Sequence, residues 1–334
     1  MRKLALIFAL AGAVSGMRGA KTLDVYFVDV EGGQATLIVT PSKQSMLVDA
    51  GWPGFNGRDV GRIHAAAKAA GIKQIDYLIV THYHTDHVGG VPQLVAKIPV
   101  KTFVDHGPNN ETGKNADELN SGYEKAVATG KHLVVKPGDK IPLKGVDVQV
   151  LTSNGEIISS PLVGGGQPNP LCGKEYPEDK SENARSTGVL ITYGKFRMIN
   201  LGDLTSHKEA ELVCPANRVG PVDVYLTTHH GTNTSNSETI VHALRPRVAI
   251  MNNGAKKGGS PDAWQIIRKS PGLEDLWQVH FAVAGGKENN SPDSFIANLE
   301  PACEGKHIKL SAQPDGSFSV SNSRNRYEKS YQAR

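Results

Sequence analysis

The chain has 334 residues and a mass of 35.7 kDa, enough for one large domain or two ordinary ones with a buried core. Hydrophobic residues make up 39% and there are 36 glycines, an apolar content that excludes a disordered chain. Lysine and arginine number 37 against 33 acidic residues. The resulting charge of +4 tolerates anionic ligands but shows no basic stripe of the kind that binds nucleic acids.

The N-terminus has the pattern of a targeting segment. Arg2 and Lys3 precede an apolar run over 4–14, and small residues follow up to Ala20. This order predicts a signal peptide over 1–20, with cleavage after residue 16 or 20, and an exported protein, periplasmic or secreted, with no stable membrane association afterwards. The three cysteines lack metal-type spacing, so they offer at most one disulfide in an oxidising compartment.

The first half of the chain begins with strands and continues with strand and helix units. Runs rich in Val, Leu, Ile and Thr predict strands at 24–30, 35–40, 45–50, 77–81, 101–105, 132–135 and 146–152. Apolar residues at helical spacing predict helices at 58–70, 88–98 and 123–129. The polar stretch 109–120 separates the two rounds of this pattern.

The second half repeats the pattern after a long polar segment at 153–185, which we expect to be a surface loop. Strands are predicted at 188–193, 196–201, 223–228 and 247–252, and helices at 206–213 and 237–244. We therefore predict one α/β domain over 21–334, an α+β sandwich of two mixed sheets packed face to face with helices outside. A β-rich extension at about 255–334 belongs to the same domain.

Four metal-binding side chains lie within six residues, directly after the predicted strand 77–81. His82 and His84 lie two apart at the strand's end and point to one side, whereas Asp86 and His87 in the following turn can face back across it. Zinc favours such nitrogen and oxygen ligands at about 2.0–2.2 Å. Two adjacent ligand sets can hold two metal ions roughly 3.5–4 Å apart.

The pattern His82-x-His84-x-Asp86-His87 resembles the signature of the metallo-β-lactamase-fold hydrolases. The resemblance spans about 24–254 and implies an αββα sandwich. It further implies that three other positions matter, each at the end of a predicted strand. Asp49 would orient the ligand loop, Asp203 would bridge two metal ions, and His229 or His230 would be the last metal histidine.

Three shorter segments resemble the ComEC-like branch of that family, which is named for the nuclease-like domain of a DNA-uptake channel. They lie at 28–35, 183–186 and 229–231. This resemblance implies phosphodiesters as substrates.

The chain departs from the family pattern where a third histidine of the first metal is expected, near 150–154. His106, at the end of the strand predicted at 101–105, would fill this gap, bind substrate or be an ordinary loop histidine. His229 and His230 are neighbours, and neighbours on a strand face opposite sides, so we expect one to be a ligand without choosing between them. Ser186 and Lys256 are weaker candidates for substrate contacts.

The expected chemistry is hydrolysis by a metal-bridging hydroxide, oriented by Asp86 or Asp203 as catalytic residues. The cofactor would be two divalent ions, zinc in the first place, with manganese or iron as alternatives. The expected substrate is a small-molecule or nucleotide phosphodiester, or another phosphoester. Nucleic acid is a further possible partner, although the sequence has no basic patch. The alternatives are a β-lactam or other cyclic amide or ester, and a non-catalytic metal-binding module.

Overall fold

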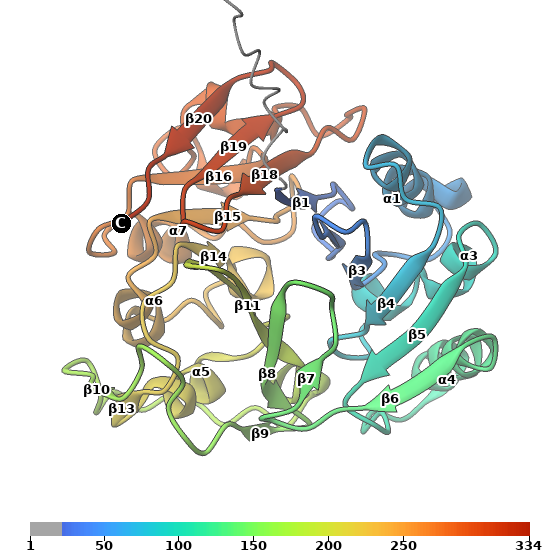
Figure 1. Ribbon diagram of the computed structural model, residues 1–334, viewed down its shortest axis with the longest axis horizontal. Coiled ribbons are helices and arrows are strands. Elements are labelled where there is room, and N and C mark those ends of the chain that lie inside the picture. The colour runs from blue at the N-terminus through green and yellow to red at the C-terminus, as the bar shows by residue number, and fades with distance from the viewer. Residues whose placement is uncertain (1–21) are drawn as a thin grey trace, which may run out of the picture.

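A computed structural model describes residues 22–334, so the predicted signal peptide at 1–20 lies outside the described residues. Two nine-stranded mixed sheets face each other and helices cover their outer sides, as Figure 1 shows. This is the αββα sandwich predicted from the sequence, and the fold class is confirmed. Within the described part of the chain, no helix combines the length and apolar character needed to cross a membrane.

The first sheet is antiparallel on one side and parallel on the other. Its order is β20 (Glu328–Tyr331), β19 (Phe318–Asn322), β18 (Ile308–Ala312), β1 (Leu23–Phe27), β2 (Thr36–Val39), β3 (Ser45–Val48), β4 (Ile75–Ile79), β5 (Val100–Asp105) and β6 (Lys131–Val134). The helices that follow the parallel strands are α1 (Arg58–Ala69), α2 (Thr85–Val88), α3 (Val91–Val95) and α4 (Lys114–Val127). Figure 1 shows α1, α3 and α4 on the outer side of this sheet.

The second sheet has the order β17 (Ile296–Asn298), β16 (Asp275–His280), β15 (Val248–Met251), β14 (Val224–Leu226), β12 (Phe196–Asn200), β11 (Gly188–Tyr193), β8 (Asp147–Ser153) and β7 (Lys140–Ile141), with β9 (Glu156–Ile157) beside β8. Its parallel part runs from β12 to β17. The helices between these strands are α5 (Ser206–Val213), α6 (Glu238–Leu244) and α7 (Pro261–Arg268).

The core forms because strand side chains alternate between the two faces of each sheet. In β1, Val25 and Phe27 enter the layer between the sheets, whereas Tyr26 packs toward the helices. The layer between the sheets is the largest apolar cluster, and separate clusters lie under the helices of each sheet. Burial on both faces explains why the central strands are almost continuously apolar.

Two helical predictions need correction, and one helix was not predicted. The helix expected at 88–98 is interrupted between α2 and α3, where the Gly90 backbone nitrogen donates to the Gly51 carbonyl oxygen and not within the helix. A Cβ at Gly90 would lie 2.1 Å from the Ala50 carbonyl oxygen. The close approach of the two backbones therefore requires glycine at this position. The helix α4 begins at Lys114, inside the stretch predicted to be a polar loop. Its first turns have no apolar pattern because the helix buries only Ala116, Tyr123 and Ala126. The helix α7 was not predicted, and it also buries only two side chains.

The C-terminal residues are built into both sheets. The strands β16 and β17 extend the second sheet, whereas β18 pairs with β1 in the first, Leu23 lying opposite Ala312. The segment from about 255 onward, expected to be an extension of the domain, thus completes its two sheets.

The long segment at 153–185 is fastened to the second sheet. Besides β9 it contains the short strand β10 (Gln167–Pro168), which pairs with β13 (Ala216–Asn217), and a 3-10 helix, η2 (Glu182–Arg185). A disulfide joins Cys172 in this segment to Cys214 after α5, and Cys303 is free. The chain thus has one disulfide, the most that its three cysteines allow.

Replacing both disulfide cysteines, as Cys172→Ser with Cys214→Ser, is expected to lower the free energy of unfolding by about 2–4 kcal/mol, because the crosslink restricts the unfolded chain. Urea unfolding with and without a reducing agent measures this. The reductant should destabilise the wild type and leave the double variant unchanged. Equal sensitivity of both proteins would contradict the prediction.

Candidate metal centre

The candidate ligands meet where the parallel strands of both sheets end. Asp49 follows β3 and His82 follows β4 in the first sheet, whereas Asp203 follows β12 in the second. A 3-10 turn, η3 (Thr228–Gly231), follows β14 and carries the two neighbouring histidines. The carboxyl ends of parallel strands are where open sheets bind ligands, and here two such edges face each other.

Four of the predicted ligands form one compact group. The ligand atoms of Asp86, His87, Asp203 and His230 all lie within 4.8 Å of one another. His87 Nε2 is 3.2 Å from both Asp86 Oδ2 and Asp203 Oδ2, and His230 Nε2 is 3.3 Å from the same two oxygens. Each of the four residues is at most 5% exposed.

The donor atoms of this group fit a divalent metal ion. His87 Nε2, His230 Nε2 and Asp203 Oδ1 are buried and have no hydrogen-bond partner. Buried polar atoms without a partner are costly and therefore rare, and here three of them belong to one compact group of side chains. Two histidine nitrogens and two carboxylates are ligands of the type that zinc, manganese and iron accept.

A second pair of ligands adjoins the first group. His82 Nε2 lies 3.1 Å from His84 Nδ1 and 3.9 Å from Asp203 Oδ2. His84 Nε2 is also 2.8 Å from a carboxylate oxygen of Glu111, which precedes α4. The pair can provide two ligands of another metal ion, with Asp203 shared between both ions. Glu111 stands in a stretch predicted to be a plain polar loop, and nothing in its spacing indicated this contact.

Both neighbouring histidines face Asp203, contrary to our expectation that they point to opposite sides. They do not lie on a strand: both have left-handed backbones, with φ of 52° for His229 and 55° for His230. His229 Nε2 is 3.4 Å from Asp203 Oδ2. His230 belongs to the buried group, whereas the side chain of His229 is 17% exposed at its edge.

A buried asparagine holds this unusual turn. The side-chain nitrogen of Asn236 donates to the carbonyl oxygens of Thr228 and Thr232, on either side of the two histidines. Tyr225 in β14 donates its hydroxyl to the Asn236 side-chain oxygen. These contacts compensate for the left-handed backbone, which is unfavourable for residues other than glycine.

Asp49 lies behind the ligand loop, where its two oxygens contact three groups. Oδ1 accepts a hydrogen bond from the Thr81 backbone nitrogen, and Oδ2 accepts one from the Thr81 hydroxyl. Oδ2 is also 2.7 Å from His87 Nδ1. A carboxylate on Nδ1 fixes the ring and directs Nε2 into the group, as such carboxylates do behind metal-binding histidines.

Ser186 is completely buried behind the ligands. Its hydroxyl accepts a hydrogen bond from the Asp203 backbone nitrogen and lies 3.5 Å from His82 Nδ1. This position supports two candidate ligands and leaves no surface for the substrate contact that we expected.

Two other candidates lie away from the cluster. His106 Nε2 is 2.9 Å from a carboxylate oxygen of Glu182 in η2, and the ring packs against Tyr83. The structure therefore does not bring His106 to the place of the missing third histidine. Lys256 is exposed, whereas its neighbour Lys257 contacts Asp86 Oδ2. The pattern of two adjacent lysines gave no means of choosing between them.

Charges within the centre act on its protonation. Burial would raise the pKa of Asp203, but the surrounding histidines hold that pKa well below its usual range. Burial keeps the pKa of His82 well below the usual value, so this ring offers a lone pair. Burial would also lower the pKa of His87, but three neighbouring carboxylates raise it well above the usual value. A cation bound by His87 Nε2 therefore competes with a proton.

Comparison with known proteins agrees with this geometry. The sequence profile of the metallo-beta-lactamase superfamily matches residues 28–180. Residues 28–180 are therefore similar to a domain of this superfamily. ComE operon protein 3 of Bacillus subtilis (strain 168) is 30% identical over 188 residues, which are 56% of this chain and 21% of that protein. Recombination protein 2 of Haemophilus influenzae is 26% identical over 235 residues, 70% of this chain and 24% of that protein.

The metallo-beta-lactamase resemblance is thus confirmed, and these two relatives together with competence protein ComA of Neisseria gonorrhoeae support the ComEC-like branch. The chain spans only about a quarter of the length of these curated relatives. Among solved structures, the metallo-beta-lactamase fold protein YhfI of Bacillus subtilis is 10% identical with a TM-score of 0.49, covering 77% of this chain and 96% of that one.

The substitution Asp49→Asn is expected to weaken metal binding about 10- to 100-fold, because an amide cannot hold His87 as a carboxylate does. Titration of zinc against a competing chelator measures the affinity. Asp76→Asn is the matched control, since Asp76 is also buried and bonds the backbone nitrogen of Ser45, but lies outside the cluster. Equal zinc affinities of the two variants would contradict a role of Asp49 in orienting His87.

Proposed function

We propose that the protein is a metal-dependent hydrolase that cleaves phosphodiesters or other phosphoesters. The observation that carries the proposal is the buried group of Asp86, His87, Asp203 and His230, in which His87 Nε2, His230 Nε2 and Asp203 Oδ1 have no hydrogen-bond partner. Such an arrangement is costly for stability unless a ligand compensates for it. Its place between two strand edges, at one end of the sandwich, suits a reaction centre.

The residues of this centre have different roles in the proposed reaction. One metal ion would be held by the buried group of four, and another by His82 and His84 with Asp203 as the shared ligand. When bound, two divalent ions lower the pKa of water and stabilise negative charge on the reacting group. Asp86 and Asp203 carry the oxygens that can accept a hydrogen bond from the attacking water. His229, whose side chain is 17% exposed at the edge of the centre, lies where it can contact a leaving group.

Lys257 supports an anionic substrate. Its ammonium group contacts Asp86 Oδ2 and lies 4.9 Å from the centre of the Trp52 ring, with a third of its side chain exposed. The positive charge therefore stands at the open edge of the centre, where a phosphate oxygen would be attracted. The names of the relatives, a competence and a recombination protein, agree with a phosphodiester substrate without identifying it.

Export is part of the proposal. The charged and apolar order of residues 1–20 predicts a signal peptide, and the disulfide between Cys172 and Cys214 suits an oxidising compartment. We therefore expect the enzyme to act outside the cytoplasm.

The protein loaded with zinc or manganese is expected to hydrolyse bis-p-nitrophenyl phosphate or single-stranded DNA, and Asp203→Asn to lower kcat/KM roughly 1,000-fold, the equivalent of several kcal/mol of charge stabilisation. Asp105→Asn is the matched control, because Asp105 is also a buried aspartate at a strand end, bonded to Tyr123 outside the centre. Metal content is measured in every variant.

The same assay separates the alternatives. Hydrolysis of a chromogenic cephalosporin without any phosphodiesterase activity would favour a cyclic amide as substrate. Bound metal without hydrolysis of either compound would favour a binding module. Full activity of Asp203→Asn with unchanged metal content would overturn the proposed centre.

The substitution Lys257→Ala is expected to raise KM for an anionic phosphodiester about tenfold, the effect of losing roughly 1.4 kcal/mol of charge attraction, with kcat little changed. Lys256→Ala is the control: it removes the same charge from the neighbouring residue, whose side chain is exposed, and should leave KM unchanged. Steady-state kinetics at low ionic strength compares them. Equal KM values for the two variants would show that Lys257 takes no part in substrate binding.

A further inference from the structure

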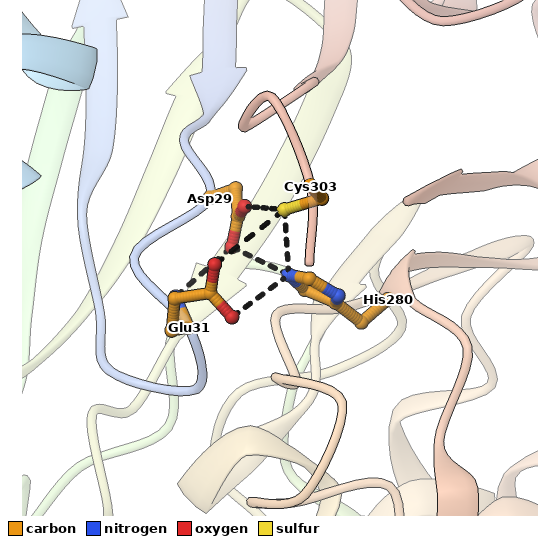
Figure 2. A group of neighbouring side chains, drawn as sticks. All are labelled: Asp29, Glu31, His280 and Cys303. Carbon is orange, nitrogen blue, oxygen red and sulfur yellow. Dashed lines mark hydrogen bonds and ion pairs between the residues drawn. The ribbon is translucent and has the colours of Figure 1, made fainter. Parts of the chain in front are cut away.

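A second cluster of metal-binding side chains lies outside the candidate centre. Asp29 and Glu31 come from the loop between β1 and β2, His280 ends β16, and Cys303 lies in the loop before β18. Figure 2 shows that the four side chains, from three distant segments, point toward one another. Their ligand atoms lie within 4.8 Å of one another.

The four side chains are close enough for one metal ion to contact all of them. Ligands at about 2.0–2.3 Å from a tetrahedral zinc ion lie about 3.3–3.8 Å apart. In the cluster, His280 Nε2 is 2.8 Å from an Asp29 oxygen and 3.5 Å from a Glu31 oxygen. Cys303 Sγ is 3.2 Å from Asp29, 3.5 Å from Glu31 and 3.9 Å from His280 Nε2. His280 faces one oxygen of each carboxylate and Cys303 the other, and the separations of 2.8–3.9 Å allow one oxygen of each carboxylate to join the nitrogen and the sulfur around one ion.

The cluster is not arranged as a cysteine nucleophile with a histidine base. Such a triad needs the two ring nitrogens of the histidine to serve different partners. Here the same atom, His280 Nε2, faces both Asp29 and Cys303. Burial and the nearby Asp29 raise the pKa of the Cys303 thiol to about 12, which is unfavourable for a nucleophile in the absence of a cation.

The charges leave room for a further cation. Arg62 Nη1 is 2.8 Å from Asp29 and 3.1 Å from Glu31, so one guanidinium faces two carboxylates. Asp29 and His280 are fully buried, whereas Glu31 and Cys303 are partly exposed and leave a path from solvent. Two carboxylates share this one guanidinium, and uncompensated negative charge in a buried position is unfavourable, so a divalent ion between the carboxylates, His280 and Cys303 would be stabilising there.

We propose that Asp29, Glu31, His280 and Cys303 form a site for a divalent metal ion of the zinc type, separate from the hydrolytic centre. Nitrogen, oxygen and sulfur donors together suit zinc, and four protein ligands leave no open position, as in structural sites. On binding, the Cys303 thiol gives up its proton to solvent and sulfur becomes a ligand.

The site would fasten the loop between β1 and β2 to the C-terminal part of the chain. The same loop reaches the candidate centre, because the Gln34 backbone nitrogen donates to the carbonyl oxygen of Asp86 at 3.1 Å. A Cβ at Gly33 would lie only 2.5 Å from that oxygen, so loop and ligand turn are in close contact. An ion at the cluster would thus support the position of Asp86.

Cobalt substitution tests the site selectively, because the hydrolytic centre contains no cysteine. The full chain is stripped with a chelator and loaded with Co²⁺. A sulfur-to-cobalt charge-transfer band in the near ultraviolet is expected in the wild type and also in the Asp86→Ala, His87→Ala double variant. The band should be absent in Cys303→Ser and strongly weakened in Glu31→Gln. The zinc content of Cys303→Ser should be one equivalent lower than that of the wild type.

Glu304→Gln is the matched control, because Glu304 adjoins Cys303 but pairs only with Lys306 among the described contacts. It should keep the band. No charge-transfer band in the wild type, with equal zinc content in wild type and Cys303→Ser, would overturn the proposal and leave an ion-pair cluster around Arg62. A band in the double variant that has lost hydrolysis would separate this site from the proposed function.

Discussion

The arrangement of the candidate centre depends on one carboxylate, that of Asp203. Its Oδ2 atom lies 3.2–3.4 Å from nitrogens of His87, His229 and His230 and 3.9 Å from His82. These histidines come from both sheets, so the atom is the point where the two halves of the sandwich meet. Because the four rings are held together around one negative charge, a shift of either sheet edge would separate ligands that must act together.

The support around these ligands is extensive and buried. Asp49 holds His87 from one side, and Ser186 bonds the Asp203 backbone and lies beside His82 on the other. Gln34 links the sheets directly, donating to Asn200 at the end of β12. A site whose ligands are themselves hydrogen-bonded is preorganised, which lowers the cost of binding a metal ion.

The sequence predicted the fold class and most residues of the candidate centre, because apolar strands followed by His and Asp give a strong local pattern. It failed where tertiary contacts decide the outcome. His229 and His230 face the same carboxylate only because a turn replaces the strand expected there. The contact of Glu111 with His84, the choice of Lys257 over Lys256 and the grouping of Asp29 with Cys303 all join distant segments, and no spacing in the sequence records them.

The pairing of β1 with β18 has a consequence for how the molecule is made. Asp24 lies opposite Ser311, so the middle of the first sheet is closed by residues almost 290 positions apart. Contacts of such long range form late and slowly, since the loop-closure entropy must be overcome first. During synthesis β1 has an open edge on this side until β18 has left the ribosome. The nascent chain therefore carries a sheet edge open to wrong partners while the residues between these two strands are made.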